Sequence, residues 1–150
     1  MAQWKCAVRY ANIAAMWQRA VGLRAFGFGD AGPMRQRLTA LTLVGTKVAT
    51  GDLWQQGYLD EGEAVEEVGE RLAVLHDDNQ VGAIIEITRV EKYRFAEVPW
   101  EFASAEGEGF TSIEHWRDGH RSYFARHDVD VDDTSIFVRL WFRLVETRPA

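Results

Sequence analysis

Apolar residues recur at helical spacing in three parts of the chain. Within residues 4–21, positions i, i+3, i+4 and i+7 are apolar, which predicts an amphipathic helix packed on a core. A second helix is expected from Pro33, a residue suited to a helix start, up to the break at Gly45. A Ser/Thr-x-x-Glu pattern at 111–114 is typical of a helix start, so it predicts a third helix. Its apolar stripe contains Ile113, Trp116, His120, Tyr123 and Phe124.

Other segments have the composition of β-strands or loops. Residues 72–75 and 81–90 are rich in apolar and β-branched side chains and are separated by a polar turn, which predicts a hairpin. Residues 135–146 alternate, and their even-numbered side chains are expected to face the core. A β-rich run at 46–50 predicts a further strand, whereas the glycine-rich 22–32 is expected to be a loop. Without regular β-α-β alternation, the fold class predicted is α+β, with a curved, mainly antiparallel sheet.

Length and composition predict a single domain. The 150 residues are 47% hydrophobic, enough for one core, so we expect one unit over 1–150. In this unit the N-terminal helix covers about 4–21, and the other elements cover about 28–147. Cys6 is the single cysteine, and no apolar run in the sequence approaches the length of a membrane span. These features predict a cytoplasmic protein that is not bound to a membrane.

The charge is acidic overall but unevenly distributed. A net charge of −6 argues against a protein that coats nucleic acid indiscriminately, because such binding depends on neutralising phosphates. Residues 1–58, however, hold seven Lys/Arg and two Asp/Glu, so a basic face is compatible with an acidic molecule. The last strand also sets Arg139 and Arg143 beside Trp141, a combination able to stack on bases and pair with phosphates. The alternative is an ordinary outer sheet face with solvated arginines.

Lys47 and Thr50 are the first candidates for chemistry, because an amine and a hydroxyl lie three residues apart just after a glycine turn. On a strand, side chains three apart point to opposite faces, so the two share a pocket only if the strand bends or stops near Gly51. The four histidines have no usable metal-ligand spacing, and there is no second cysteine. The sequence therefore predicts neither a metal site nor a cofactor.

Several motifs follow one another in a fixed order along most of the chain. They are Phe28-Gly29-Asp30, Leu43-Val44-Gly45-Thr46-Lys47-Val48-Ala49-Thr50, Ile84 to Val90, Phe102 to Gly109, Trp116-Arg117 with His120, and the aromatic last strand. In these motifs the sequence resembles the longer bacterial type of the ASCH family, whose fold is a small PUA-like β-barrel flanked by helices. It departs from the family pattern at Gly51-Asp52, where a small residue and a serine are usual, and at Phe110, where an aspartate is usual.

The resemblance implies a site as well as a fold. ASCH domains are regarded as RNA-associated, and a shorter relative hydrolyses N4-acetylcytidine with a lysine, a threonine and a glutamate. Carried onto this chain, Lys47, Thr50 and Glu108 become the catalytic candidates, and the expected substrate-binding residues are Glu106, Thr46, Arg139, Trp141 and Arg143. Thr50 would attack, Lys47 would take its proton and Glu108 would manage protons or water. If Glu108 contacts Lys47, however, the resting site is an ion pair and Lys47 acts first as an electrostatic anchor.

Three functions follow from this resemblance. The first is a hydrolase that removes an acyl group from N4-acylated cytidine or a related nucleoside. The second is a noncatalytic RNA-binding domain, and the third is a ribonuclease acting on single-stranded RNA. The partner expected is thus RNA or a modified nucleoside; no stable protein partner is predicted, and a homodimer is left open. The simplest alternative is that a lysine–glutamate bridge only closes one end of a barrel.

Overall fold

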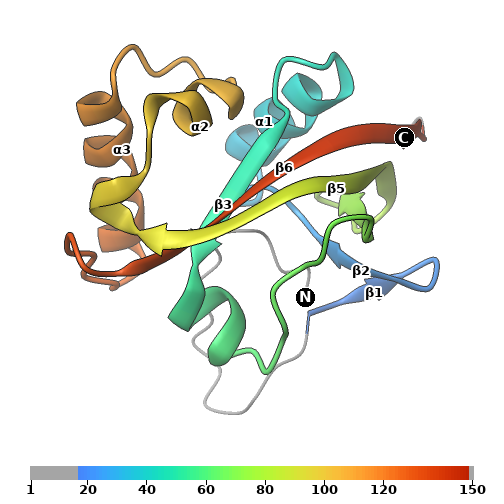
Figure 1. Cartoon of the computed structure of the whole chain (residues 1–150). Helices are drawn as coiled ribbons and strands as arrows, with labels where there is room; N and C mark the ends of the chain where they lie inside the picture. Colours follow the sequence, from blue (N-terminus) through green and yellow to red (C-terminus); the bar gives the residue numbers. More distant parts are fainter. Residues whose placement is uncertain (1–16, 149–150) are drawn as a thin grey trace.

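The computed structural model describes residues 17–148, in which one six-stranded sheet is flanked by helices (Figure 1). The strands are β1 (Arg19–Ala20), β2 (Leu23–Phe26), β3 (Ala49–Leu53), β4 (Arg71–Leu75), β5 (Val81–Arg94) and β6 (Ile136–Thr147). The helices are α1 (Pro33–Leu43), α2 (Trp100–Ala105) and α3 (Ile113–Arg126), with a π-helical turn at Gln55–Leu59 and a 3-10 turn at Phe95–Glu97. No helix in this part of the chain is long and apolar enough to cross a membrane.

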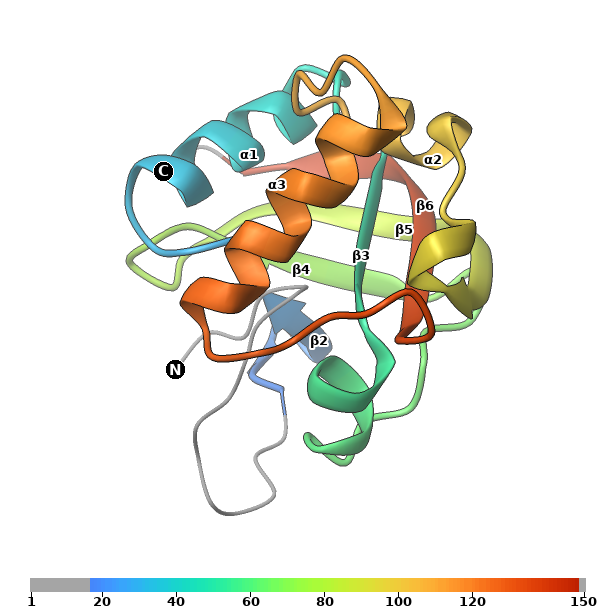
Figure 2. The ribbon, with the colours of Figure 1, turned by 90° about the vertical axis from the view of Figure 1, so that its left-hand side faces the viewer.

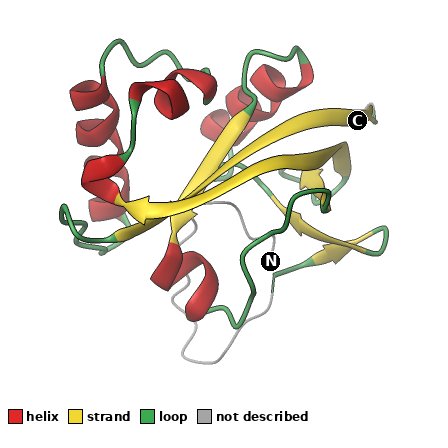
Figure 3. Cartoon of the chain, in the orientation of Figure 1, coloured by secondary structure: helices red, strands yellow, loops and turns green. Residues whose placement is uncertain are grey.

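The strands lie in the order β1-β2-β4-β5-β6-β3. All neighbouring pairs are antiparallel except β2 and β4, which are parallel. The long strands β5 and β6 twist across the molecule, and the short strands lie on either side of them (Figure 3). Over residues 17–148 the sheet is not closed, because β1 and β3 form its two edges. The structure therefore confirms the α+β class and the mainly antiparallel sheet, in an open form.

Most elements with a strong periodic pattern are where the sequence predicts them. These are α1, the hairpin of β4 and β5, α3 and β6. The expected loop over 22–32 is wrong, because it contains β2, which pairs with β1 and with β4. Strand pairing, a tertiary interaction, has overridden the local signal of the glycines. The helix expected over 4–21 lies mostly outside the described residues; at its end, Arg19–Ala20 is a strand rather than a helix.

The helices divide the core into two main parts. Figure 2 shows α3 crossing one face of the sheet, with α1 and α2 on either side of it. One cluster of buried residues, with Phe102, Trp116 and Phe124, packs beneath α2 and α3. The other, with Phe26, Phe28 and Leu38, packs beneath α1.

Strand β6 contributes to both core clusters. Phe137 belongs to the cluster beneath α2 and α3, whereas Val138, Leu140 and Phe142 belong to the cluster beneath α1. The prediction that only the even-numbered side chains face a core is therefore wrong for Phe137, which is fully buried. Consecutive residues 137–140 of β6 are all buried, so an alternating apolar pattern does not by itself identify a solvent-exposed face.

Candidate functional site

Lys47 and Thr50 line one pocket, as the catalytic hypothesis requires. The two side chains reach the same pocket although the strand does not end at Gly51, because β3 continues through Gly51 to Leu53. Lys47 instead precedes the strand, which begins at Ala49, so the alternation of strand side chains does not separate it from Thr50. The expected break at Gly51 is wrong, and this glycine serves packing: a Cβ atom here would overlap the ring of Phe137.

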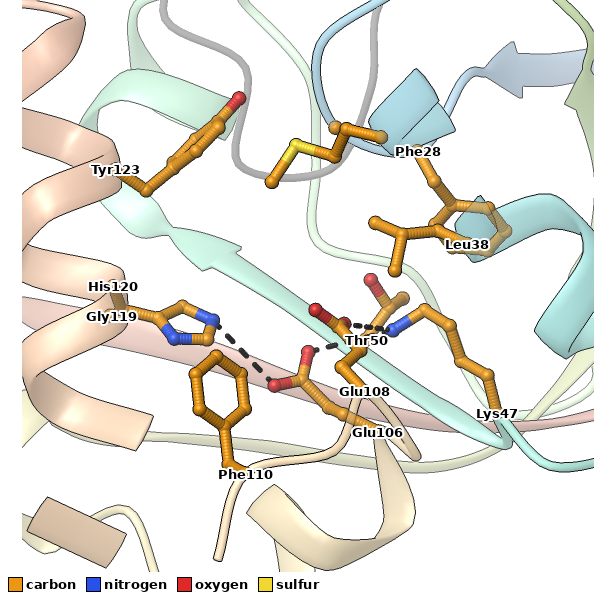
Figure 4. A pocket seen from close by; sticks show the side chains of 12 residues that line it. Phe28, Leu38, Lys47, Thr50, Glu106, Glu108, Phe110, Gly119, His120 and Tyr123 are labelled. Atoms are coloured by element: carbon orange, nitrogen blue, oxygen red, sulfur yellow. Dashed lines mark hydrogen bonds and ion pairs between the residues drawn. The ribbon is translucent and has the colours of Figure 1, made fainter. Parts of the chain in front are cut away.

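The pocket has a polar floor and apolar walls (Figure 4). The space enclosed by these walls, counting the part that is open to solvent, is about 470 Å³. The polar lining consists of Lys47, Thr50, Glu106, Glu108 and His120. The apolar and aromatic lining includes Phe28, Met34, Leu38, Phe110 and Tyr123. These residues come from α1, α3, the start of β3 and the loop after α2, so the pocket lies where the three helices meet the sheet.

The ammonium of Lys47 is buried in an ion pair. Its Nζ atom donates to Oε2 of Glu108 at 2.7 Å and to the carbonyl of Ala49 at 2.9 Å. It also lies 5.2 Å from the ring centroid of Phe28, within the range of a cation–π contact. Only 1% of the Lys47 side chain is exposed. The resting site is thus the ion pair expected if these two residues meet, and the charged lysine is an anchor rather than a free base.

Glu106 is the second carboxyl beside this ammonium, but it is held differently. Its Oε1 atom accepts a hydrogen bond from the indole N–H of Trp116 at 2.5 Å, and its Oε2 atom lies 3.7 Å from Nζ of Lys47. Burial raises the pKa of Glu106 to about 8; the ammonium of Lys47 opposes this rise and the neighbouring charge of Glu108 adds to it. Glu106 therefore holds its proton to a higher pH than an ordinary glutamate does.

Glu108 and His120 complete the charge balance of the pocket. Burial alone would raise the pKa of Glu108, but the ammonium of Lys47 and other nearby positive charge outweigh it and lower the pKa below its usual value. Burial lowers the pKa of His120 to about 4, so the imidazole is neutral. Its ring stacks on Trp116 with centroids 3.9 Å apart, and Nδ1 lies 2.9 Å from the Trp116 carbonyl. At pH 7 the floor carries one positive and one negative charge.

A glycine turn places the two glutamates together. Gly107 has φ +65°, a left-handed conformation that costs an L-residue about 1–2 kcal/mol. A Cβ atom at this position would also overlap the carbonyl oxygen of Thr46. The backbone beside Lys47 and the Glu106–Glu108 turn can therefore approach closely only with glycine here. Thr46 itself contributes its main chain to this contact and does not line the pocket, so no substrate contact of its side chain is evident.

Among the predicted substrate-binding residues, Glu106 lines the pocket, whereas Arg139, Trp141 and Arg143 lie outside its lining. Arg139 is 5% exposed and donates to Glu91 at 2.7 Å and to a main-chain carbonyl. Arg143 pairs with Glu86 at 3.1 Å. Trp141 is partly buried against the core beneath α2 and α3. Carboxylates thus neutralise both arginines of the last strand, which is the arrangement of an ordinary sheet face.

Sequence reasoning missed the part of the site that comes from α3. Trp116 and His120 lie four residues apart on the predicted stripe, where they were expected only to pack on the core. Both do so, but they also face Glu106, with His120 Nε2 at 3.6 Å from its Oε1 atom. A histidine in an otherwise apolar stripe was the signal available. In the described part of the chain, no group of three or more His, Cys, Asp or Glu residues could hold a metal ion.

Comparisons with known proteins agree with this architecture. A family model described as "ASCH domain" matches residues 24–146. Among solved structures, the chain is similar to an ASCH domain from Lactobacillus crispatus JV V101, with 30% identity and a TM-score of 0.69 over 80% of this chain and 77% of that one. It is also similar to a protein from Enterococcus faecalis V583, with 26% identity and a TM-score of 0.74 over 87% and 80%. A search of curated proteins found no match.

Proposed function

We propose a function from the premise that this chain belongs to the ASCH domain family. The proposal is a hydrolase that removes the acyl group from an acylated exocyclic amine of a nucleoside, of the N4-acylcytidine type. The observation that carries it is the 2.7 Å ion pair of Lys47 and Glu108 on the wall of a pocket that Thr50 also lines. Amide hydrolysis needs a nucleophile, a base and a stabilised oxyanion, and these three side chains can supply them.

The electrostatics of the pocket support a particular set of roles in this proposal. Lys47 is paired with a carboxylate, so it acts as the cation that stabilises the developing oxyanion rather than as the base. Glu108 is ionised and takes the proton of the attacking hydroxyl. Thr50 provides that hydroxyl, and Figure 4 shows its side chain directed into the same hollow as Lys47 and Glu108. This differs from the expected scheme, in which Lys47 removes the proton.

The pocket favours a planar, uncharged ligand. One ammonium and one carboxylate balance on its floor, so a ligand with a net charge gains little from them. Aromatic rings at Phe28 and Phe110 form part of the walls, where they can pack against a flat base. Free nucleosides meet both conditions, since they carry a planar ring and no phosphate.

The test is hydrolysis of N4-acetylcytidine by the purified protein, followed as cytidine released. We expect turnover by wild type, a loss of about 10²-fold or more in Glu108→Gln and Thr50→Val, and little change in Glu101→Gln. Glu101 is the matched control because its side chain is 65% exposed and lies on α2, outside the pocket. A folded wild-type protein that releases no cytidine would rule out the proposal.

RNA binding is the second candidate, favoured by the family. ASCH domains are PUA-like and generally associated with RNA, and the proposal extends to this chain only as noncatalytic binding. Retention of unstructured RNA at two salt concentrations tests it, because polymer binding weakens steeply with salt. The same assay, read for shortened RNA, tests ribonuclease activity. Retention without cytidine release would favour the binding function, whereas shortened RNA would favour cleavage.

A further inference from the structure

Two carboxyls on either side of a single glycine share one ammonium unequally. Glu108 approaches Nζ of Lys47 to 2.7 Å, whereas Glu106 remains at 3.7 Å. The Glu108 side chain is 13% exposed and that of Glu106 only 2% exposed. When one cation serves two buried carboxyls, ionising both is costly, and the more buried one keeps its proton. The site therefore contains one carboxylate and one carboxylic acid.

Trp116 and His120 fix the orientation of the Glu106 carboxyl. The indole N–H donates to Oε1 and Oε2 lies on the side of Lys47, so contacts on both oxygens set the direction of the carboxyl. Because a carbonyl only accepts, Nδ1 of His120 donates to the main chain of Trp116. A neutral imidazole then has its lone pair on Nε2, 3.6 Å from Glu106 Oε1, and brings no positive charge that would favour ionised Glu106.

We propose that Glu106 is a catalytic residue, the general acid that protonates the departing amine nitrogen. This role rests on the proposed hydrolase function and adds to it the proton donor that the set of Lys47, Thr50 and Glu108 lacks. Lys47 is held by Glu108 and Ala49, so it is poorly placed to give up a proton. Two carboxyls whose environments separate their protonation states form a standard acid–base pair.

The protons balance over the two half-reactions. In the first, Thr50 Oγ bonds to the carbonyl carbon and gives its proton to Glu108; the C–N bond breaks and its electron pair takes the proton of Glu106. In the second, water attacks the acyl-threonine and gives a proton to Glu106, while the oxygen of Thr50 leaves and recovers the proton from Glu108. One water is consumed, the carboxylic acid and the amine are released, and both glutamates return to their first states.

This role predicts a particular pH dependence. Among residues 17–148, the titratable groups that face Glu106 are Lys47, Glu108 and His120. With the pKa of Glu106 at about 8, kcat for the amide should fall above that pH as the acid is lost. Trp116→Phe removes a hydrogen bond that favours the ionised form, so its alkaline limb should move to higher pH.

The decisive experiment compares two substrates in Glu106→Gln and the control Glu101→Gln. On N4-acetylcytidine, whose amine must be protonated to leave, kcat should fall about 10²–10⁴-fold in Glu106→Gln, and the alkaline limb should disappear. On 4-nitrophenyl acetate, whose phenolate leaves without a proton, the release of 4-nitrophenolate in the first turnover should slow by less than about tenfold, because this acylation step precedes the deacylation that Glu106 also serves. Equal losses on both substrates, or an unchanged amide kcat with the alkaline limb intact, would overturn the role of Glu106.

Failure of the proposed hydrolase function and failure of the proposed role of Glu106 give different results. If wild type hydrolyses neither substrate, the hydrolase function fails and the role of Glu106 fails with it. If wild type is active and Glu106→Gln is equally active, only the role of Glu106 fails. If Glu106→Gln does not fold, Glu106→Asp replaces it: the shorter acid should keep the alkaline limb with reduced kcat, and loss of that limb in folded Glu106→Asp would contradict the role.

Discussion

The ammonium of Lys47 lies 2.7 Å from the carboxylate of Glu108, although 61 residues separate them in the chain. This contact joins the segment before β3 to the loop after α2. It is also nearly dry, because 1% and 13% of the two side chains are exposed. If one partner were removed, the other charge would be left buried without compensation, so the fold depends on keeping both members of the pair.

We expect removal of one partner to be costly. Lys47→Met leaves a buried carboxylate without its cation, and the free energy of unfolding should fall by about 3–5 kcal/mol. The double variant Lys47→Met/Glu108→Gln should recover part of the loss, since neither charge is then left unpaired. Urea denaturation measures both. The comparison is Glu101→Gln, which weakens an exposed pair with Arg89 and should cost less than about 1 kcal/mol; an equal cost for Lys47→Met would contradict the expectation.

Glu106 and His120 give the folded protein opposite pH dependences. The pKa of Glu106 rises from 4.5 to about 8 on burial, so the folded state holds a proton that the unfolded state loses, and stability falls as pH rises through this window. The pKa of His120 falls from 6.5 to about 4, so stability rises with pH between these values. The two slopes oppose each other up to about pH 6.5, and above that pH the slope of Glu106 is the larger one until about pH 8.

The expected profile is therefore nearly flat between pH 5 and 6.5 and falls by about 1 kcal/mol between pH 6.5 and 8. Urea denaturation at a series of pH values measures it. Glu106→Gln should remove the fall, because the amide does not titrate, whereas Glu101→Gln should keep it. If the free energy of unfolding of Glu106→Gln still falls by the same amount over this pH range, the group that titrates is not Glu106.

The sequence predicts the long elements of this fold better than the short ones. Helix α3 and strand β6 carry periodic patterns over 14 and 12 residues, and such patterns outweigh local exceptions. Strand β2 has only four residues between glycines, and it is a strand because β1 and β4 pair with it. No local pattern encodes that pairing, so a loop was the natural prediction.

The candidate site was also predictable from the sequence only in part. Resemblance to a family brings Lys47, Thr50 and Glu108 to attention, and the structure places all three on one pocket. The distinction between Glu106 and Glu108 is absent from the sequence, because it depends on their unequal distances of 3.7 and 2.7 Å to a cation and on which carboxyl the helix covers. Their protonation states are properties of burial, which only the folded chain defines.

Gly107 is expected to be irreplaceable for two separable reasons. Gly62 is the matched control, since its φ of +67° is close to the +65° of Gly107, but a Cβ atom there would meet no described atom within 4 Å, its chain neighbours aside. Gly62→Ala should thus cost only the conformational penalty of about 1–2 kcal/mol. Gly107→Ala should cost more, because its methyl group also meets the carbonyl of Thr46 and must displace the turn. Urea denaturation of both variants, with cytidine release by Gly107→Ala, measures this; equal costs would show that the turn adapts.

Gly119 and Phe110 shape the apolar wall together. A Cβ atom at Gly119 would lie 2.6 Å from Cε1 of Phe110, so this mid-helix glycine makes room for the ring. Gly119→Ala gains about 1 kcal/mol of helix propensity but must push the ring aside, and we expect no net stabilisation together with a changed KM for the nucleoside.

In a Phe110→Ala background the obstruction is absent, and the same Gly119→Ala change should stabilise the protein by about 1 kcal/mol. A double-mutant cycle by urea denaturation isolates the coupling between the two positions. If Gly119→Ala has the same effect in both backgrounds, the ring of Phe110 moves freely and does not set the width of the pocket. If the effect of Gly119→Ala on stability changes sign between the two backgrounds, the glycine is needed to leave space for the Phe110 ring. The helix is then less stable than it would be with alanine at position 119, and the shape of the pocket wall accounts for that loss.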